Sequence, residues 1–154
     1  MTTFLTSIFF VLMCSSCSAY FTVTLPNTGN TVVGIGNKVK YNTNVLTNPA
    51  TTVSGYDPST GIFTVLSTTA GGAGAGAGVY SLSVSMMVDG TKPTHLTLRK
   101  GAEILVWLFA HQRFNMASQT INVNLVEGDQ IFVQMNTGNE LFDVYNTFSV
   151  AKVA

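Results

Sequence analysis

Apolar and polar residues alternate along much of the chain after residue 20. The alternation is strict over 80–86, where serine fills every second position in the run Tyr-Ser-Leu-Ser-Val-Ser-Met. The same period of two recurs over 95–99, 121–125 and 131–135. This period is typical of β-strands that bury one face and expose the other, as strands of antiparallel sheets commonly do. The pattern therefore predicts several antiparallel strands.

Residues 104–110 break this pattern because the run Ile-Leu-Val-Trp-Leu-Phe-Ala is apolar throughout. A short continuous apolar run is typical of a strand that is buried on both faces, and it is too short for an ordinary helix. We therefore expect a central strand here. Its second face would be covered by another sheet or by a neighbouring subunit.

Turn-forming residues separate these runs at short intervals. They occur at 57–61 (Asp-Pro-Ser-Thr-Gly), 89–90 (Asp-Gly), 100–101 (Lys-Gly) and 127–129 (Glu-Gly-Asp). Many short strands with closely spaced turns are typical of a sandwich or jelly roll. The predicted fold is therefore an all-β, antiparallel β-sandwich jelly roll.

One low-complexity stretch, residues 70–78, consists of glycine and alanine only. Such a composition forms either a silk-like stacked sheet or a flexible connector between strands. We favour the connector, because the stretch is short and is not repeated elsewhere in the chain.

The first 19 residues have the features of a secretory signal peptide. A short apolar run over 4–13 is followed by small residues that end at Ala19, as signal peptidase requires. The run is too short to span a bilayer. The alternatives are a buried N-terminal strand or an anchor on a membrane surface. We expect a secreted protein with a single domain over 20–154, which contains neither of the chain's two cysteines and so no disulfide.

Charge is scarce and balanced, with seven basic and seven acidic residues among 154. A neutral chain has no long-range field that would attract nucleic acid. The sequence contains no Gly-x-Ser-x-Gly elbow and no His-Glu-x-x-His motif, and we interpret His95 and His111 as strand residues. We therefore expect a protein that binds rather than an enzyme.

Several segments, in order along the chain, resemble motifs of the C1q domain. Residues 56–65, Tyr-Asp-Pro-Ser-Thr-Gly-Ile-Phe-Thr-Val, resemble the family's Y-D-x-x-T-G-x-F-T-V. Residues 78–84 resemble G-x-Y-x-F-x-V, and 125–133 resemble L-x-x-G-D-x-V-x-V. Residues 20–23 and 146–150 resemble the opening and closing strands. The chain departs from the family in its Gly–Ala stretch and in lacking a collagen-like stalk.

The resemblance implies a C1q/tumour necrosis factor-like jelly roll that assembles as a homotrimer. It also implies a secreted, lectin-like module that recognises carbohydrate or microbial-surface patterns in innate immunity. The alternative is a structural protein of an extracellular matrix or of a biomineral.

Two groups of residues are candidates for sites. C1q-like trimers sometimes bind calcium near the threefold axis, and the candidate donors here are Asp89, Glu127 and Asp129, with Glu140 and Asp143 as further carboxylates. The same residue types are also ordinary turn formers, so this alternative stays open, and no other cofactor is expected. Trp107, Phe109 and Phe114 flank a nearly uncharged stretch, as residues of a subunit interface do.

The small residues before Tyr20 generate a direct prediction. N-terminal sequencing of exported material should begin at or close to Tyr20, because signal peptidase cleaves after a small-x-small pattern. Recovery of exported protein that still begins at Met1 would contradict the signal peptide.

Overall fold

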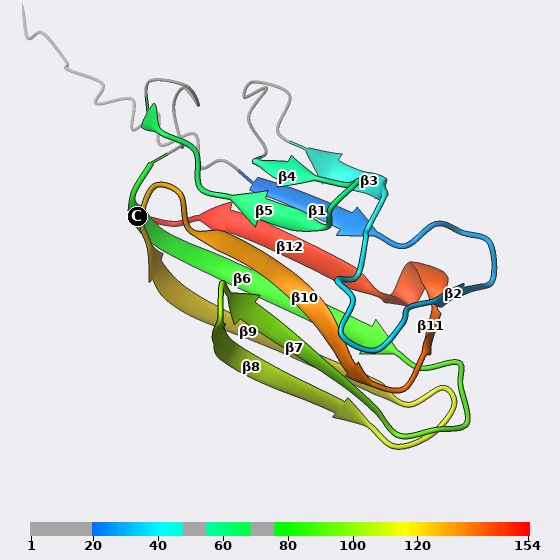
Figure 1. Cartoon of the computed structure of the whole chain (residues 1–154). Helices are drawn as coiled ribbons and strands as arrows, with labels where there is room; N and C mark the ends of the chain where they lie inside the picture. Colours follow the sequence, from blue (N-terminus) through cyan, green and yellow to red (C-terminus); the bar gives the residue numbers. More distant parts are fainter. Residues whose placement is uncertain (1–19, 48–54, 69–75) are drawn as a thin grey trace, which may run out of the picture.

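The alternation over 80–86 becomes strand β6 (Gly78–Met87), in which buried and half-buried residues alternate to the end of the strand. The fold is seen in a computed structural model, which describes residues 20–47, 55–68 and 76–154 (Figure 1). The predicted signal peptide and most of the Gly–Ala segment 70–78 lie outside these residues. No helix in the described ranges has the length and apolar character needed to cross a membrane.

Two five-stranded sheets face each other, and their strands pair in antiparallel fashion (Figure 1). The first sheet has the order β3 (Thr43–Thr47), β1 (Tyr20–Thr24), β12 (Thr147–Lys152), β6 and β9 (Met116–Leu125). The second has the order β4 (Tyr56–Asp57), β5 (Ile62–Thr64), β10 (Gln130–Thr137), β7 (Thr94–Lys100) and β8 (Glu103–Ala110). Strand β2 (Asn30–Val32) pairs with β11 (Glu140–Phe142), and a single 3-10 turn, η1 (Asp143–Tyr145), follows. The predicted antiparallel jelly roll is confirmed.

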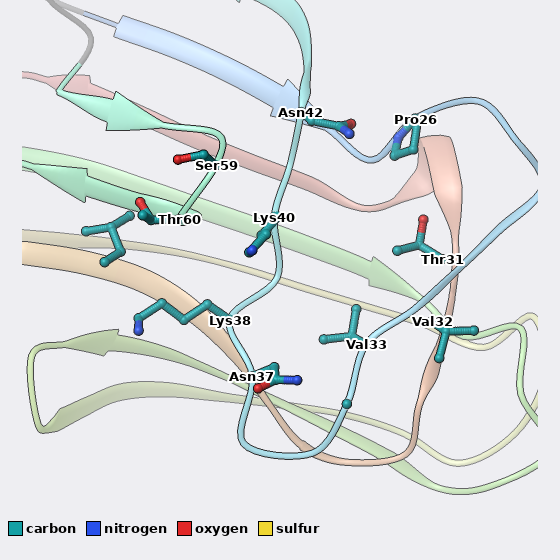
Figure 2. Close-up of a pocket in the computed structure, with 12 residues that line it drawn as sticks. Pro26, Thr31, Val32, Val33, Asn37, Lys38, Lys40, Asn42, Ser59 and Thr60 are labelled. Carbon is teal, nitrogen blue, oxygen red and sulfur yellow. The ribbon is translucent and has the colours of Figure 1, made fainter.

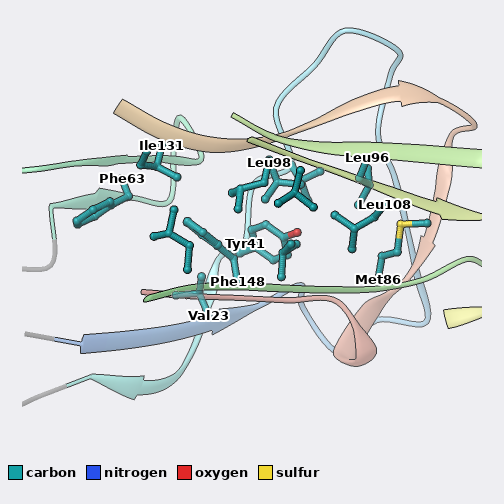
Figure 3. Close-up of a cluster of buried hydrophobic side chains, with 14 of the residues drawn as sticks. Val23, Tyr41, Phe63, Met86, Leu96, Leu98, Leu108, Ile131 and Phe148 are labelled. Atoms are coloured by element: carbon teal, nitrogen blue, oxygen red, sulfur yellow. The ribbon is translucent and has the colours of Figure 1, made fainter. Parts of the chain in front are cut away.

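The core lies between the two sheets and is filled by the inward side chains of both (Figure 3). Phe21 on β1 contacts Phe148 on β12 and Phe63 on β5, with 5.6 Å between ring centroids in each pair. The rings therefore join strands of opposite sheets. Burying one such side chain stabilises the fold by about 1.5–3 kcal/mol, so this cluster is a major contributor to the core.

Hydroxyl groups cover the outward face of the first sheet. They hydrogen-bond in pairs across neighbouring strands, at 2.7–2.9 Å: Thr22 with Ser149, Ser83 with Thr120, and Ser85 with Thr147. Each cross-strand hydroxyl pair of this kind stabilises the sheet by between a few tenths of a kcal/mol and about 1 kcal/mol. A polar face built from serine and threonine explains how this chain stays polar with so few charges.

Strand β8 differs from its prediction as a central strand. It pairs with β7 alone and lies at the edge of the second sheet. Val106, Leu108 and Ala110 are buried, whereas Trp107 and Phe109 are 55% and 50% exposed. The prediction of a central strand is therefore wrong, because a two-layer sandwich offers a covering sheet on one side only. Cover of the second face by a neighbouring subunit stays a prediction.

A buried carboxylate anchors the connection between β1 and β2. Asp143 in η1 is 1% exposed and accepts hydrogen bonds from the backbone N–H of Thr28 (2.7 Å) and from the hydroxyls of Thr28 (2.8 Å) and Thr31 (2.6 Å). Burial is the largest single influence on its pKa and would raise it. The hydrogen bonds together outweigh burial, so they hold the pKa of Asp143 below its usual range.

We predict that Asp143→Asn lowers the free energy of unfolding at pH 7 by about 1.5–3 kcal/mol, because hydrogen bonds to a charged acceptor are lost. A depressed folded-state pKa stabilises the native state above the unfolded-state value and ceases to do so as pH falls through the folded value. The wild type should therefore lose this contribution below about pH 4, the usual range of an aspartate. Urea unfolding at pH 7 and pH 3 measures both effects.

The matched control is Glu103→Gln, which makes the same carboxylate-to-amide change at an exposed end of β8. In this variant the free energy of unfolding should change between pH 7 and pH 3 by the same amount as in the wild type. A pH dependence of Asp143→Asn identical to that of the wild type would rule out the anchoring role.

Candidate functional site

The exposed side chains of β8 form an aromatic surface with the chain's two histidines. The ring of His95 on β7 lies 4.6 Å from that of Phe109 and 6.1 Å from that of Trp107, measured between centroids. The ring of His111, just beyond β8, lies 6.3 Å from that of Phe109. We name these four residues the aromatic face. The structure therefore brings two of the three predicted interface residues, Trp107 and Phe109, together on one surface.

Phe114 lies in a separate cluster, in the connection between β8 and β9. It is 53% exposed, its φ is 66°, and its backbone N–H donates to the carbonyl of Val88 at 2.7 Å. Its ring contacts that of Phe142 at 5.8 Å, and the Arg113 guanidinium lies 4.6 Å from its centroid. A positive φ is rare for a bulky side chain, so this turn holds the ring outward at a backbone cost.

The predicted calcium donor Asp89 already has a cationic partner. Its Oδ1 accepts a hydrogen bond from the Nε of Arg113 at 2.7 Å, and its Oδ2 accepts one from the Asn30 amide at 3.1 Å. This carboxylate follows β6, close to the start of β9, because Met87 pairs with Met116.

Asp129 and Glu127 lie at the opposite end of the same strand pair, where Gly78 pairs with Leu125. Ten residues of extended strand separate the two ends by about 30 Å, so Asp89 cannot share a metal ion with them within one chain. Asp129 forms an ion pair with Lys100 at 2.7 Å. Burial, the largest influence, would raise the pKa of Asp129. Lys100 and the Val126 N–H outweigh burial and lower this pKa. The calcium site stays a prediction.

A polar groove lies beside the turn that precedes β5 (Figure 2). The extended segment 38–42 forms its floor. Val39 and Tyr41 are fully buried in the core, so the alternation turns Lys38, Lys40 and Asn42 outward. The segment is fixed to β10, because the Val39 N–H donates to the carbonyl of Val133 at 2.9 Å. This alternation sets the two lysines side by side.

The turn over 57–61 forms one wall of the groove. Both oxygens of Asp57 accept hydrogen bonds within the turn, from the Ser59 hydroxyl at 2.7 Å and the Thr60 hydroxyl at 2.9 Å. These bonds, those of Ser59 first, lower the pKa of Asp57. Gly61 has a φ of +72°, and a Cβ there would lie 2.6 Å from the carbonyl oxygen of Val39. Glycine therefore lets the turn pack directly against the floor of the groove.

The segment around β2 contributes Thr31 and Val33 to the lining, on the other side of segment 38–42 from the 57–61 turn (Figure 2). The space holds about 660 Å³. The Lys38 ammonium lies 4.9 Å from the centroid of the Phe132 ring, and neither groove lysine forms an ion pair with any carboxylate of the described residues. The groove is thus a positively charged site of a size that accepts a small ligand.

Lys38 and Lys40 are not among the sites predicted from the sequence. The signal was present, because lysine alternates with Val39 and Tyr41 over 38–41. It indicates an outward face, but it does not indicate that the 57–61 turn and the β2 segment close a groove around that face.

The C1q domain family model matches residues 20–150. The structure is similar to that of Eiger TNF from S. frugiperda (TM-score 0.67, 14% identity), with 89% of this chain and 93% of that chain covered. It is also similar to the globular domain of zebrafish complement 1qA protein (TM-score 0.63, 14% identity, 89% and 98% covered) and to murine APRIL (TM-score 0.62, 16% identity, 88% and 99% covered). Comparison with curated protein sequences gave no match.

At these identities the structural neighbours establish the fold, and the family model establishes the relationship by sequence. The matched region contains every strand from β1 to β11 and most of β12. The resemblance of the 56–65 and 125–133 motifs is thereby confirmed: this chain belongs to the C1q domain family.

Proposed function

We propose that this chain is a secreted recognition module that binds carbohydrate or microbial-surface ligands as a non-covalent homotrimer and catalyses no reaction. Its place in the C1q domain family supports a ligand-binding module that associates with copies of itself. The observation that carries the proposal is the aromatic face, which the single chain leaves exposed on the edge strand β8.

An exposed edge strand with aromatic side chains is a hazard in a secreted protein, because it invites uncontrolled pairing with other chains. Closed threefold assembly, which the C1q resemblance implies, covers the same patch in every copy at once. Aromatic residues are enriched at such interfaces and charged residues are depleted. The two cysteines of the chain, Cys14 and Cys17, lie in the predicted signal peptide, and its removal would leave no cysteine for a covalent link between copies.

Assembly also serves recognition. Each copy in a trimer presents its own groove, and linked sites raise the overall affinity about 10²- to 10⁴-fold when all of them reach the ligand surface together. Repeated saccharides on a cell surface are ligands of this kind. A structural matrix or biomineral role is the alternative. It is less well supported, because the carboxylates of Asp89 and Asp129, which could contact a mineral, are already paired with the side chains of Arg113 and Lys100. A glycan array, run beside a mineral-binding assay, distinguishes the two roles.

We predict that Trp107→Ser combined with Phe109→Ser dissociates the oligomer and leaves the monomer folded, because both rings are exposed in the single chain. Aromatic residues central to an interface typically contribute 2 kcal/mol or more, so the dissociation constant should rise by about thirtyfold or more. Sedimentation equilibrium over a range of micromolar concentrations measures this change.

Val126→Ser is the matched control, since Val126 is equally exposed (57%) but lies in the turn between β9 and β10, away from the aromatic face. This variant should sediment as the wild type does. A wild-type protein that stays monomeric throughout the concentration range would contradict the homotrimer.

A further inference from the structure

Neither lysine of the groove forms an ion pair with a carboxylate of the described residues. Lys100 and Arg113 each form an ion pair with an aspartate at 2.7 Å. Lys38 and Lys40 stand two positions apart on an extended segment, so their backbone positions are separated by only about 7 Å. Two like charges at this spacing repel each other, and the contact of Lys38 with the Phe132 ring does not neutralise either charge. Their placement therefore needs another explanation.

We propose that this groove binds a negatively charged saccharide, whose carboxylate or sulfate pairs with Lys38 and Lys40. The inference rests on the proposed recognition function and specifies its ligand. A single anionic group that lies between two ammonium groups relieves their repulsion and gains charge-assisted hydrogen bonds from both. The contact of Lys38 with the Phe132 ring holds its side chain over that ring and leaves its positive charge uncompensated.

The rest of the lining suits a sugar better than a bare anion. The hydroxyls of Ser59 and Thr31 donate their hydrogens to Asp57 and Asp143, so their oxygens point acceptor lone pairs toward other donors, such as sugar hydroxyls. The amide of Asn42 adds donors and an acceptor at the end of the lysine row. Pro26, which is half-buried, offers apolar surface to the C–H groups of a sugar ring.

One carboxylate limits which ligands fit. Asp57 lies in the turn that forms the wall, and its negative charge opposes an anion placed at the Ser59 side of the groove. The carboxylate oxygens of Asp57 already accept hydrogen bonds from the hydroxyls of Ser59 and Thr60, and these bonds draw its negative charge toward the turn. The acidic group of the ligand therefore sits toward Lys38, and the neutral hydroxyls of the sugar face the turn.

Paired saccharide probes test the proposal on the secreted protein. An array would carry each acidic oligosaccharide beside its neutral counterpart: oligogalacturonate with its methyl ester, 3′-sulfolactose with lactose, and sialyl-lactose with lactose. We expect binding to an acidic member of at least one pair and loss of binding to its neutral partner. The pair that responds identifies carboxylate or sulfate as the recognised group. Inorganic sulfate alone should compete only weakly, because it lacks the hydroxyls.

Variants of the two lysines test the site itself. Lys38→Gln combined with Lys40→Gln should weaken binding of the acidic probe by about tenfold or more, since two charge-assisted contacts are lost. Lys38→Arg combined with Lys40→Arg keeps both positive charges and should retain most of the affinity for the acidic probe. Lys92→Gln, which removes an exposed lysine from the loop between β6 and β7, is the matched control and should bind as the wild type does. Thermal unfolding of each variant verifies that the fold is intact.

Three outcomes would overturn the inference: no acidic probe binds, each neutral partner binds as well as its acidic counterpart, or the double Gln variant binds unchanged. Binding of neutral saccharides independent of the lysines would overturn this inference alone and leave the proposed recognition function standing. Absence of any saccharide binding would count against both.

Discussion

Most strands in the described part of the chain bury one face against the opposite sheet, because the two five-stranded sheets cover each other and neither has a further sheet over its outer side there. The aromatic core, the hydroxyl pairs, the aromatic face and the groove all depend on this constraint. The aromatic cluster of Phe21, Phe63 and Phe148 forms where inward side chains of the two sheets meet. Every side chain on the alternate positions must then find a polar partner, a neighbouring loop or another molecule.

The outward positions resolve this requirement in three different ways. On the first sheet, serine and threonine hydroxyls pair across strands and need no charge. On β8 the burial of Val106 and Leu108 leaves Trp107 and Phe109 exposed on the single chain, and the proposed homotrimer would cover them. In segment 38–42 the burial of Val39 and Tyr41 turns two lysines outward, and loops close a groove around them.

The groove also depends on contacts that are remote from it in sequence. Asp143 holds Thr31, which lines one wall, and Gly61 allows the opposite wall to approach the backbone of Val39. A buried carboxylate with satisfied hydrogen bonds is rigid, because breaking any of its bonds leaves a charge without a partner in a low dielectric. The same interaction therefore stabilises the fold and fixes the shape of the site.

The sequence by itself determined the strands around 80–86, 95–99, 121–125 and 131–135 and the set of their apolar side chains that faces the core. The alternation over 80–86 and 121–125 and the turn at 57–61 are local patterns, and local steric and solvation preferences decide them. The order of motifs along the chain was also sufficient to indicate the C1q domain. Only the tertiary structure decided which strands are neighbours. It placed β8 at an edge, separated Asp89 from Asp129 by the length of a strand, and enclosed Lys38 and Lys40 between a turn and the β2 segment. These outcomes depend on pairing between residues far apart in the chain, and a period of two specifies the face of a strand without specifying its partner.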